Sequence, residues 1–315
     1  MNLRIVIAIS LLPAAIAGDL SLHSELGQPG WLKVDHGYII GFARVARETG
    51  HDAIEAFDGA GRRVLGVDVR GQIPEAAQIT LYDVALRPGG PLVAGGVIRK
   101  TDNRLDAVLL YFKWDGALIR KIDLPVEQEI NRLAIDEDGT VWTLADYSGR
   151  DDETRGPLVF QYDGTGQLLK GLLRRTDYRT GFQEGGSIGG VAGFGFTREG
   201  IWFWQPARHR MTIITRDGRV LSRVSIPLPD PRKDRNLHPP ELDSIALLPS
   251  GQIAAGIGPD YVPIGAYLSN GKHFVRASSE RLRLIGVDGE DFVFLKLYRP
   301  ESGLLEIVRE RVPHV

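Results

Sequence analysis

A short phrase of an apolar residue, a small residue and a second apolar residue returns along the chain, each time just before a turn. Its clear copies are Val84-Ala85-Leu86, Leu133-Ala134-Ile135, Phe194-Gly195-Phe196, Ile245-Ala246-Leu247 and Ile285-Gly286-Val287. Leu32-Lys33-Val34 keeps the two outer apolar residues and has Lys33 at the small position. Self-similarity at a spacing of roughly 50 residues indicates a repeat architecture, and short strands separated by turns are typical of propeller blades.

A second phrase recurs in phase with the first: a strand-like run, then Asp-Gly or Asn-Gly, then another strand-like run. The dipeptides are Asp58-Gly59, Asp115-Gly116, Asp163-Gly164, Asp217-Gly218 and Asn270-Gly271. Because these residues accept the positive φ of a tight turn, such a dipeptide between apolar runs is a strong hairpin signal. Together the two phrases predict four strands, a to d, in each repeat.

The spacing predicts six blades, near residues 31–69, 79–125, 130–174, 191–228, 242–278 and 282–312. The last blade lacks a clear d strand, and residues 20–26 are placed to supply it. The predicted fold is an all-β, six-bladed β-propeller of four-stranded antiparallel blades, its ring closed by pairing of the N- and C-terminal strands. We expect the small residue of the first phrase where inner strands crowd a narrow central channel.

The run from Leu133 to Trp142, LAIDEDGTVW, resembles the strand–turn–strand signature of the NHL-repeat and gluconolactonase-like six-bladed β-propellers. The resemblance extends over nearly the whole chain after the N-terminal segment. It implies the fold, and function has to be argued from a site built on that fold.

The N-terminal segment has the composition of an export signal. Arg4 gives it a positive start, residues 5–12 are apolar, and Ala15-Ile16-Ala17 matches the small-x-small cleavage pattern. We expect residues 1–17 to be a signal peptide and residues 18–315 to be a single propeller domain, periplasmic or secreted. The chain has no Cys, which excludes disulfides and thiolate metal sites.

Charge and hydropathy exclude two classes of partner. The formal net charge is -2, and no basic tail is present, so the chain lacks the basic surface that nucleic acid requires. No segment approaches the ~20 consecutive apolar residues that span a bilayer. We therefore expect no nucleic-acid partner, no integral membrane segment, and a monomer.

Strand alternation within a blade places the a–b and c–d turns on one face of the ring and the b–c and d–a connections on the other, here called the long-loop face. Nearly all the long insertions belong to the second class. They are residues 46–52, 99–106, 147–157, 174–190, 227–241 and 258–264. Long loops on a rigid scaffold commonly carry binding residues.

Several of these loops contain aromatic residues close to arginine, a composition typical of interface hot spots. We therefore predict an exported, non-catalytic binding or scaffold module that engages a protein, peptide or saccharide through the long-loop face. The candidate ligand-binding residues are Tyr147, Tyr178, Arg179, Phe182, His238 and Tyr261.

The alternative is a metal-dependent hydrolase or lactonase with its site at the mouth of the central channel. Asn131 and Asp243 occupy the same position before their strands, and Glu241 precedes Asp243 by two residues. Oxygen ligands from several blades could hold a hard divalent cation such as Ca²⁺. The resemblance to gluconolactonase-like propellers implies the same ligand types, Glu, Asn and Asp. Gly30 and Trp31, however, stand where that group has a first-blade Glu.

Without that Glu, the leading expectation is no metal cofactor, and thermal denaturation tests it. A cation that binds only the native state raises the melting temperature. We expect millimolar Ca²⁺, Mg²⁺, Mn²⁺ or Zn²⁺ to leave the melting temperature unchanged. A rise that Asp243→Asn abolishes, and that the control Asp115→Asn in an Asp-Gly turn preserves, would favour the hydrolase instead.

Overall fold

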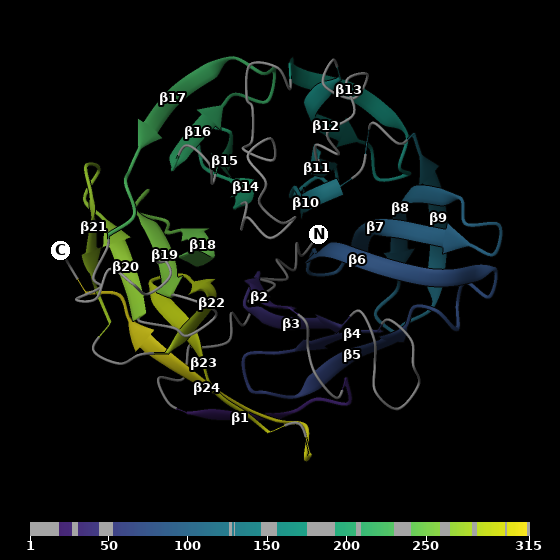
Figure 1. The fold of residues 1–315 in the computed structure, drawn as a ribbon, viewed down its shortest axis with the longest axis horizontal. Helices are drawn as coiled ribbons and strands as arrows, with labels where there is room; N and C mark the ends of the chain where they lie inside the picture. The colour runs from purple at the N-terminus through teal and green to yellow at the C-terminus, as the bar shows by residue number, and fades with distance from the viewer. Residues whose placement is uncertain are drawn as a thin grey trace, which may run out of the picture.

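The computed structural model describes residues 19–26, 31–43, 53–125, 128, 130–145, 156–174, 193–205, 209–229, 241–258, 265–278, 282–299 and 301–313. Its strands form six four-stranded antiparallel sheets arranged as blades around a common axis (Figure 1). The predicted six-bladed β-propeller is therefore confirmed. Within the described ranges no helix is long and apolar enough to cross a membrane.

Each blade runs outward from an inner strand beside the axis (Figure 1). Blade 1 contains β2 (Trp31–Asp35), β3 (Tyr38–Ala43), β4 (Ala53–Phe57) and β5 (Arg63–Asp68). Blade 2 contains β6 (Ala76–Leu86), β7 (Leu92–Lys100), β8 (Leu105–Phe112) and β9 (Leu118–Leu124). Blade 3 contains β10 (Ile130–Ile135), β11 (Val141–Ala145), β12 (Pro157–Tyr162) and β13 (Leu168–Arg174).

The remaining blades repeat this order. Blade 4 contains β14 (Phe194–Phe196), β15 (Ile201–Gln205), β16 (Arg210–Ile214) and β17 (Val220–Ser225). Blade 5 contains β18 (Glu241–Leu247), β19 (Ile253–Gly258), β20 (Gly265–Ser269) and β21 (Phe274–Arg276). Blade 6 contains β22 (Arg283–Asp288), β23 (Asp291–Arg299), β24 (Leu304–Arg311) and, as its outermost strand, β1 (Leu20–His23).

The ring closes as the sequence predicts. β1 pairs antiparallel with β24, so the N-terminal strand completes the last blade. Leu22 of β1 is fully buried and packs with Ile39 of blade 1 and Ile307 of blade 6. The first and last described strands are therefore held together by both a backbone ladder and an apolar contact.

The core is divided into six apolar clusters, one between each pair of neighbouring blades. Trp142 belongs to the cluster between blades 3 and 4, and Trp202 to the cluster between blades 4 and 5. Since each sheet buries both faces, its middle strands read as nearly continuous apolar runs. Each blade therefore buries both of its apolar faces against a neighbour on either side.

In blades 2 and 6 the small residue of the recurring phrase packs against a neighbouring blade. Val84 and Leu86 pack in the cluster between blades 1 and 2, whereas Ala85 between them packs in the cluster between blades 2 and 3. In blade 6 a β-carbon at Gly286 would lie 2.8 Å from the β-carbon of Val34 in blade 1. In these two blades the neighbouring blade limits the size of this side chain, and the expected crowding at the central channel stays a prediction.

The predicted hairpins are present, but in two of them a different glycine takes the positive φ. Gly116 has a φ of 85° and ends a turn closed by its own N–H donating to the carbonyl of Lys113. Asp58-Gly59 and Asp163-Gly164 open their turns instead, and Gly61 and Gly166 take the positive φ. The fourth residue of the turn needs the left-handed conformation.

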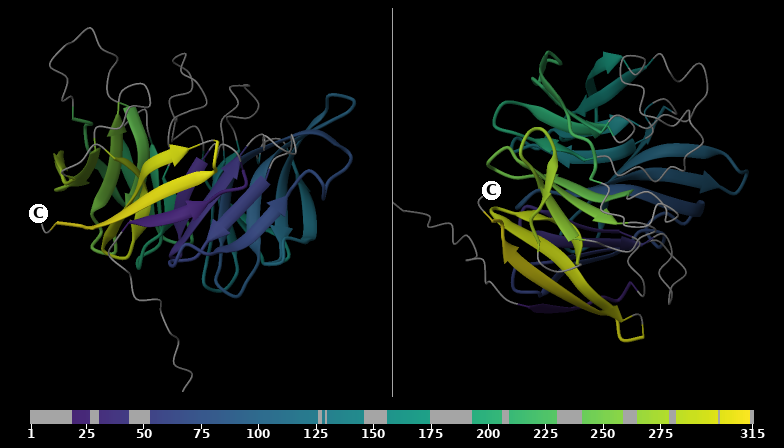
Figure 2. Two further views of the ribbon diagram at one scale, coloured as in Figure 1. Left: turned by 90° about the horizontal axis from the view of Figure 1, so that it is seen from below. Right: turned by 60° about the vertical axis from the view of Figure 1, so that its left-hand side comes forward.

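Seen from the side, the tight turns lie at one face of the ring and the strand ends that lead into the other connections lie at the opposite face (Figure 2). The insertion expected at residues 99–106 is wrong, because residues 99–100 end β7 and residues 105–106 begin β8. Those strands join through a short turn in which the N–H of Lys100 donates to the carbonyl of Arg104. Most residues of the other predicted insertions lie outside the described residues.

The outer strands of blades 1 to 4 share an irregularity. Beside the c–d turn each strand skips one residue of the ladder, which leaves Val64, Ile119, Leu169 and Leu221 in β-bulges. Ile119, Leu169 and Leu221 are exposed, at 49%, 52% and 39%. The outer wall of three successive blades therefore carries an aliphatic side chain at the same place.

A buried carboxylate connects the closing strand to blade 1. Glu55 on β4 is fully buried and accepts hydrogen bonds from the hydroxyl of Ser24 at 2.7 Å and the N–H of Glu25 at 2.9 Å. The Arg63 Nε lies 3.0 Å from the same carboxylate. Burial raises the pKa of Glu55 above its ordinary 4.5, although these donors oppose the shift.

Glu55 should therefore make stability depend on pH. An acid with a raised native pKa stabilises the fold fully below its unfolded pKa and loses that contribution as pH rises through the native value. We expect the free energy of unfolding of wild type, relative to Glu55→Gln, to fall as pH rises above about 4.5. Denaturant titrations from acid to neutral pH measure it. Glu137→Gln, in an exposed turn, is the control, and a relative rise with pH would contradict this account.

Candidate functional site

Three inner strands carry a bulge at the same place, two residues before the apolar–small–apolar phrase. In β6, β10 and β18 the backbone ladder skips Tyr82, Asn131 and Asp243 there. Bulges are over-represented near binding sites because they re-aim a side chain. Asn131 and Asp243, which the sequence spacing places at equivalent positions, thus both lie in a bulge. Their proposed role as metal ligands stays a prediction.

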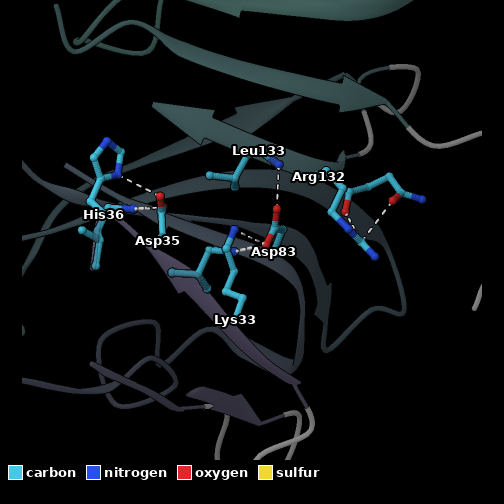
Figure 3. A network of polar contacts seen from close by, with 9 residues as sticks. Lys33, Asp35, His36, Asp83, Arg132 and Leu133 are labelled. Carbon is cyan, nitrogen blue, oxygen red and sulfur yellow. Dashed lines mark hydrogen bonds and ion pairs between the residues drawn. The ribbon is translucent and has the colours of Figure 1, made fainter. Parts of the chain in front are cut away.

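β2 turns a row of polar and aromatic residues toward blade 2. Leu32 and Val34 pack in the cluster shared with blade 6, so Trp31, Lys33 and Asp35 alternate to the other side. The Lys33 Nζ lies 2.9 Å from Oδ1 of Asp83 on β6 (Figure 3). At the position that is Ala or Gly in the other blades, blade 1 thus presents a cation to its neighbour.

Asp83 joins the inner strands of three blades. Asp83 is 4% exposed. Besides Lys33 of blade 1, it accepts hydrogen bonds from its neighbour Val84, whose N–H lies 2.9 Å from Oδ1, and from Leu133 of blade 3, whose N–H lies 2.9 Å from Oδ2 (Figure 3). Charge-assisted hydrogen bonds of this kind are stronger than neutral ones.

Asp35 makes a similar link at the tight-turn end of β2. Its Oδ2 accepts a hydrogen bond at 3.0 Å from the N–H of Leu86, the last residue of β6. Its Oδ1 lies 2.8 Å from Nδ1 of His36, and this hydrogen bond raises the pKa of His36. Blades 1 and 2 are therefore connected by side chains from the middle and from the last residue of β2.

Arg132 lies at the long-loop end of β10. Its Nη1 donates to the carbonyl of Asn131 at 2.6 Å and to Oδ1 of the same residue at 3.1 Å (Figure 3). The guanidinium carbon lies 5.8 Å from the centroid of the Trp31 ring, within the range of a cation–π contact. Trp31 of blade 1 and Arg132 of blade 3 therefore contact each other although blade 2 lies between their blades.

The predicted metal ligands have cationic neighbours. Asp243 accepts a hydrogen bond from Nε of Arg283 at 3.0 Å, and the Asn131 amide oxygen accepts one from Arg132. Over the described ranges, no group of three or more His, Cys, Asp or Glu is placed to hold a metal ion. Glu241 begins β18. Arginine beside both candidate oxygens opposes a divalent cation at that position.

The predicted ligand-binding residues lie outside the described residues, so their role stays a prediction. They are Tyr147, Tyr178, Arg179, Phe182, His238 and Tyr261. The polar contacts of Lys33 and the Trp31–Arg132 contact were missed in the sequence. A signal for Lys33 was present, because it interrupts the small position of the recurring phrase.

Comparisons with protein-family models and with curated proteins found no match. Solved structures share the fold. A member of the duf4221 family from Bacteroides vulgatus is 10% identical, with a TM-score of 0.56 over 94% of this chain and 98% of that one. A putative exported protein from Bacteroides fragilis is 9% identical, with a TM-score of 0.53 over 95% of each chain.

The soluble aldose sugar dehydrogenase from Escherichia coli is 11% identical, with a TM-score of 0.51 over 94% of this chain and 100% of that one. At such identities these similarities show the β-propeller fold alone. The resemblance to NHL-repeat propellers therefore remains a likeness of pattern.

Asp83 should matter more to stability than Asp243. Asp83→Ala leaves the Lys33 ammonium and two backbone amides without this acceptor, and a buried donor without an acceptor costs about 1–3 kcal/mol. Asp243→Ala removes one partly exposed ion pair, which is worth about 1 kcal/mol or less. We expect Asp83→Ala to lower the free energy of unfolding by at least about 2 kcal/mol more than Asp243→Ala in denaturant titrations. Equal losses would contradict the role given to Asp83.

Proposed function

We propose that this protein is an exported, non-catalytic binding module that takes a protein, peptide or saccharide ligand at its long-loop face. The supporting observation is that polar and aromatic side chains of the inner strands contact one another from blade to blade. Trp31, Asp83, Arg132, Asp243 and Arg283 come from five different blades. Apart from blades 1 and 6, whose inner strands turn at His36-Gly37 and at Gly289, the opposite face repeats similar tight turns.

The electrostatics favour binding over hydrolysis. Each carboxylate described in this region already has a cationic partner, Lys33 for Asp83 and Arg283 for Asp243. A general base or metal ligand would have to give up that partner. The paired groups can instead donate and accept hydrogen bonds in fixed positions, which is what ligand recognition needs. Among the described residues of this region, no contact favours the hydrolase alternative.

Export is part of the proposal. The N-terminal composition of an export signal supports it, and a similar fold occurs in the putative exported protein from Bacteroides fragilis. A propeller without Cys relies on packing between blades for stability, so an oxidising compartment would not alter it.

The long-loop face can be tested with arrays of immobilised peptides and oligosaccharides. Once a ligand is found, we expect Tyr178→Ala/Phe182→Ala to weaken its binding by about tenfold or more, because aromatic hot spots carry most of the binding energy. The melting temperature should stay near that of wild type. Leu169→Ala/Leu221→Ala, two exposed aliphatic residues on the outer wall, is the matched control.

Binding affected only by the outer-wall variant would place the ligand elsewhere and reject the proposal. Ligand turnover, followed by chromatography of the bound oligosaccharide or peptide, would reject the non-catalytic role.

A further inference from the structure

Lys33 departs from the pattern that the other five blades keep. The equivalent residues there are Ala85, Ala134, Gly195, Ala246 and Gly286. Ordering a lysine side chain costs about 1.5–2 kcal/mol of rotamer entropy, and an alanine costs none. The lysine of blade 1 therefore has to be explained by the contacts of its ammonium.

The inner strands leave room for this side chain. β6 packs closely on β10, and β22 packs closely on both β18 and β2, whereas β2 and β6 approach each other less closely. Lys33 extends from β2 toward β6 across this wider separation (Figure 3). Its side chain remains 27% exposed, although that of Asp83 is only 5% exposed. The ammonium therefore lies at the solvent-facing side of the pair.

Asp83 does not depend on Lys33 for its hydrogen bonds. The N–H groups of Val84 and Leu133 donate to its two carboxylate oxygens. An ammonium has three N–H donors, and within the described residues the acceptor of Lys33 is Oδ1 of Asp83 alone. Lys33 thus retains donors for a ligand while Asp83 fixes its position.

Arg132 on β10 is a second cation in this region, and its contact with the Trp31 ring orients its side chain. A hydrogen bond from an ammonium to a carboxylate is charge-assisted and stronger than one to a neutral acceptor. The remaining donors of Lys33 therefore favour a ligand with a carboxylate group.

We propose that Lys33 anchors the carboxylate group of the ligand between the inner strands of blades 1 and 2. This inference rests on the proposed binding function and names the chemistry that the site selects. The carboxylate accepts hydrogen bonds from the N–H donors of the Lys33 ammonium that Asp83 leaves unused. A carboxylate could come from a sugar acid or from the end of a peptide, and both supply the same charge and acceptors.

Titration calorimetry with two matched pairs of probes tests the carboxylate. Glucuronate is compared with glucose, and N-acetylalanine with its amide. We expect at least one carboxylate to bind about tenfold or more tightly than its neutral counterpart, with the preferred pair identifying the source. Lys33→Met should abolish this preference, Lys33→Arg should keep part of it, and Lys272→Met, in a c–d turn on the opposite face, should leave it unchanged.

Chemical acetylation of wild type provides a readout that does not depend on a variant. The preferred carboxylate should slow acetylation of Lys33 at least about threefold and leave Lys272 unaffected, as measured by mass spectrometry of peptides. If neither carboxylate exceeds its neutral counterpart, or if Lys33→Met keeps the preference, the inference is wrong. A neutral ligand that binds in a Tyr178- and Phe182-dependent way would then still support the binding function.

Discussion

Burial between blades is the constraint on which the rest of this structure depends. Each four-stranded sheet has two apolar faces, and neither can be covered within its own blade. Six such sheets cover one another's apolar faces when they form a closed ring. In this ring the N-terminal strand β1 completes the last blade. Since the hydrophobic effect scales with the area removed from water, the six clusters supply most of the stabilisation in a chain without Cys.

The aspartates of the inner strands complement that packing. Asp35 and Asp83 each accept an N–H from the inner strand of the next blade, at Leu86 and Leu133. These hydrogen bonds are directional, so they join neighbouring inner strands at defined residues, whereas apolar contacts are non-directional. A polar group placed there must be fully satisfied, because an unpaired group in such surroundings is costly. Blade 1 alone adds a lysine to this arrangement.

The sequence predicts the fold well because its signals are periodic. Asp-Gly turns and the apolar–small–apolar phrase recur in phase, so an error in one repeat is corrected by the others. The ring closure follows from an outer strand missing at the C-terminus. What the sequence does not reveal is contact between blades. Nothing in the local pattern around Trp31 shows that it meets Arg132, about a hundred residues away.

The blade edges at the outside of the ring face a hazard that a closed barrel avoids. An outer strand offers unpaired backbone groups on which a strand from another molecule could assemble. In β9, β13 and β17 a bulge interrupts the ladder beside the turn, with an aliphatic side chain at the interruption. A strand bent in this way matches no straight incoming partner over its full length. Crowded molecules can therefore collide edge to edge without polymerising.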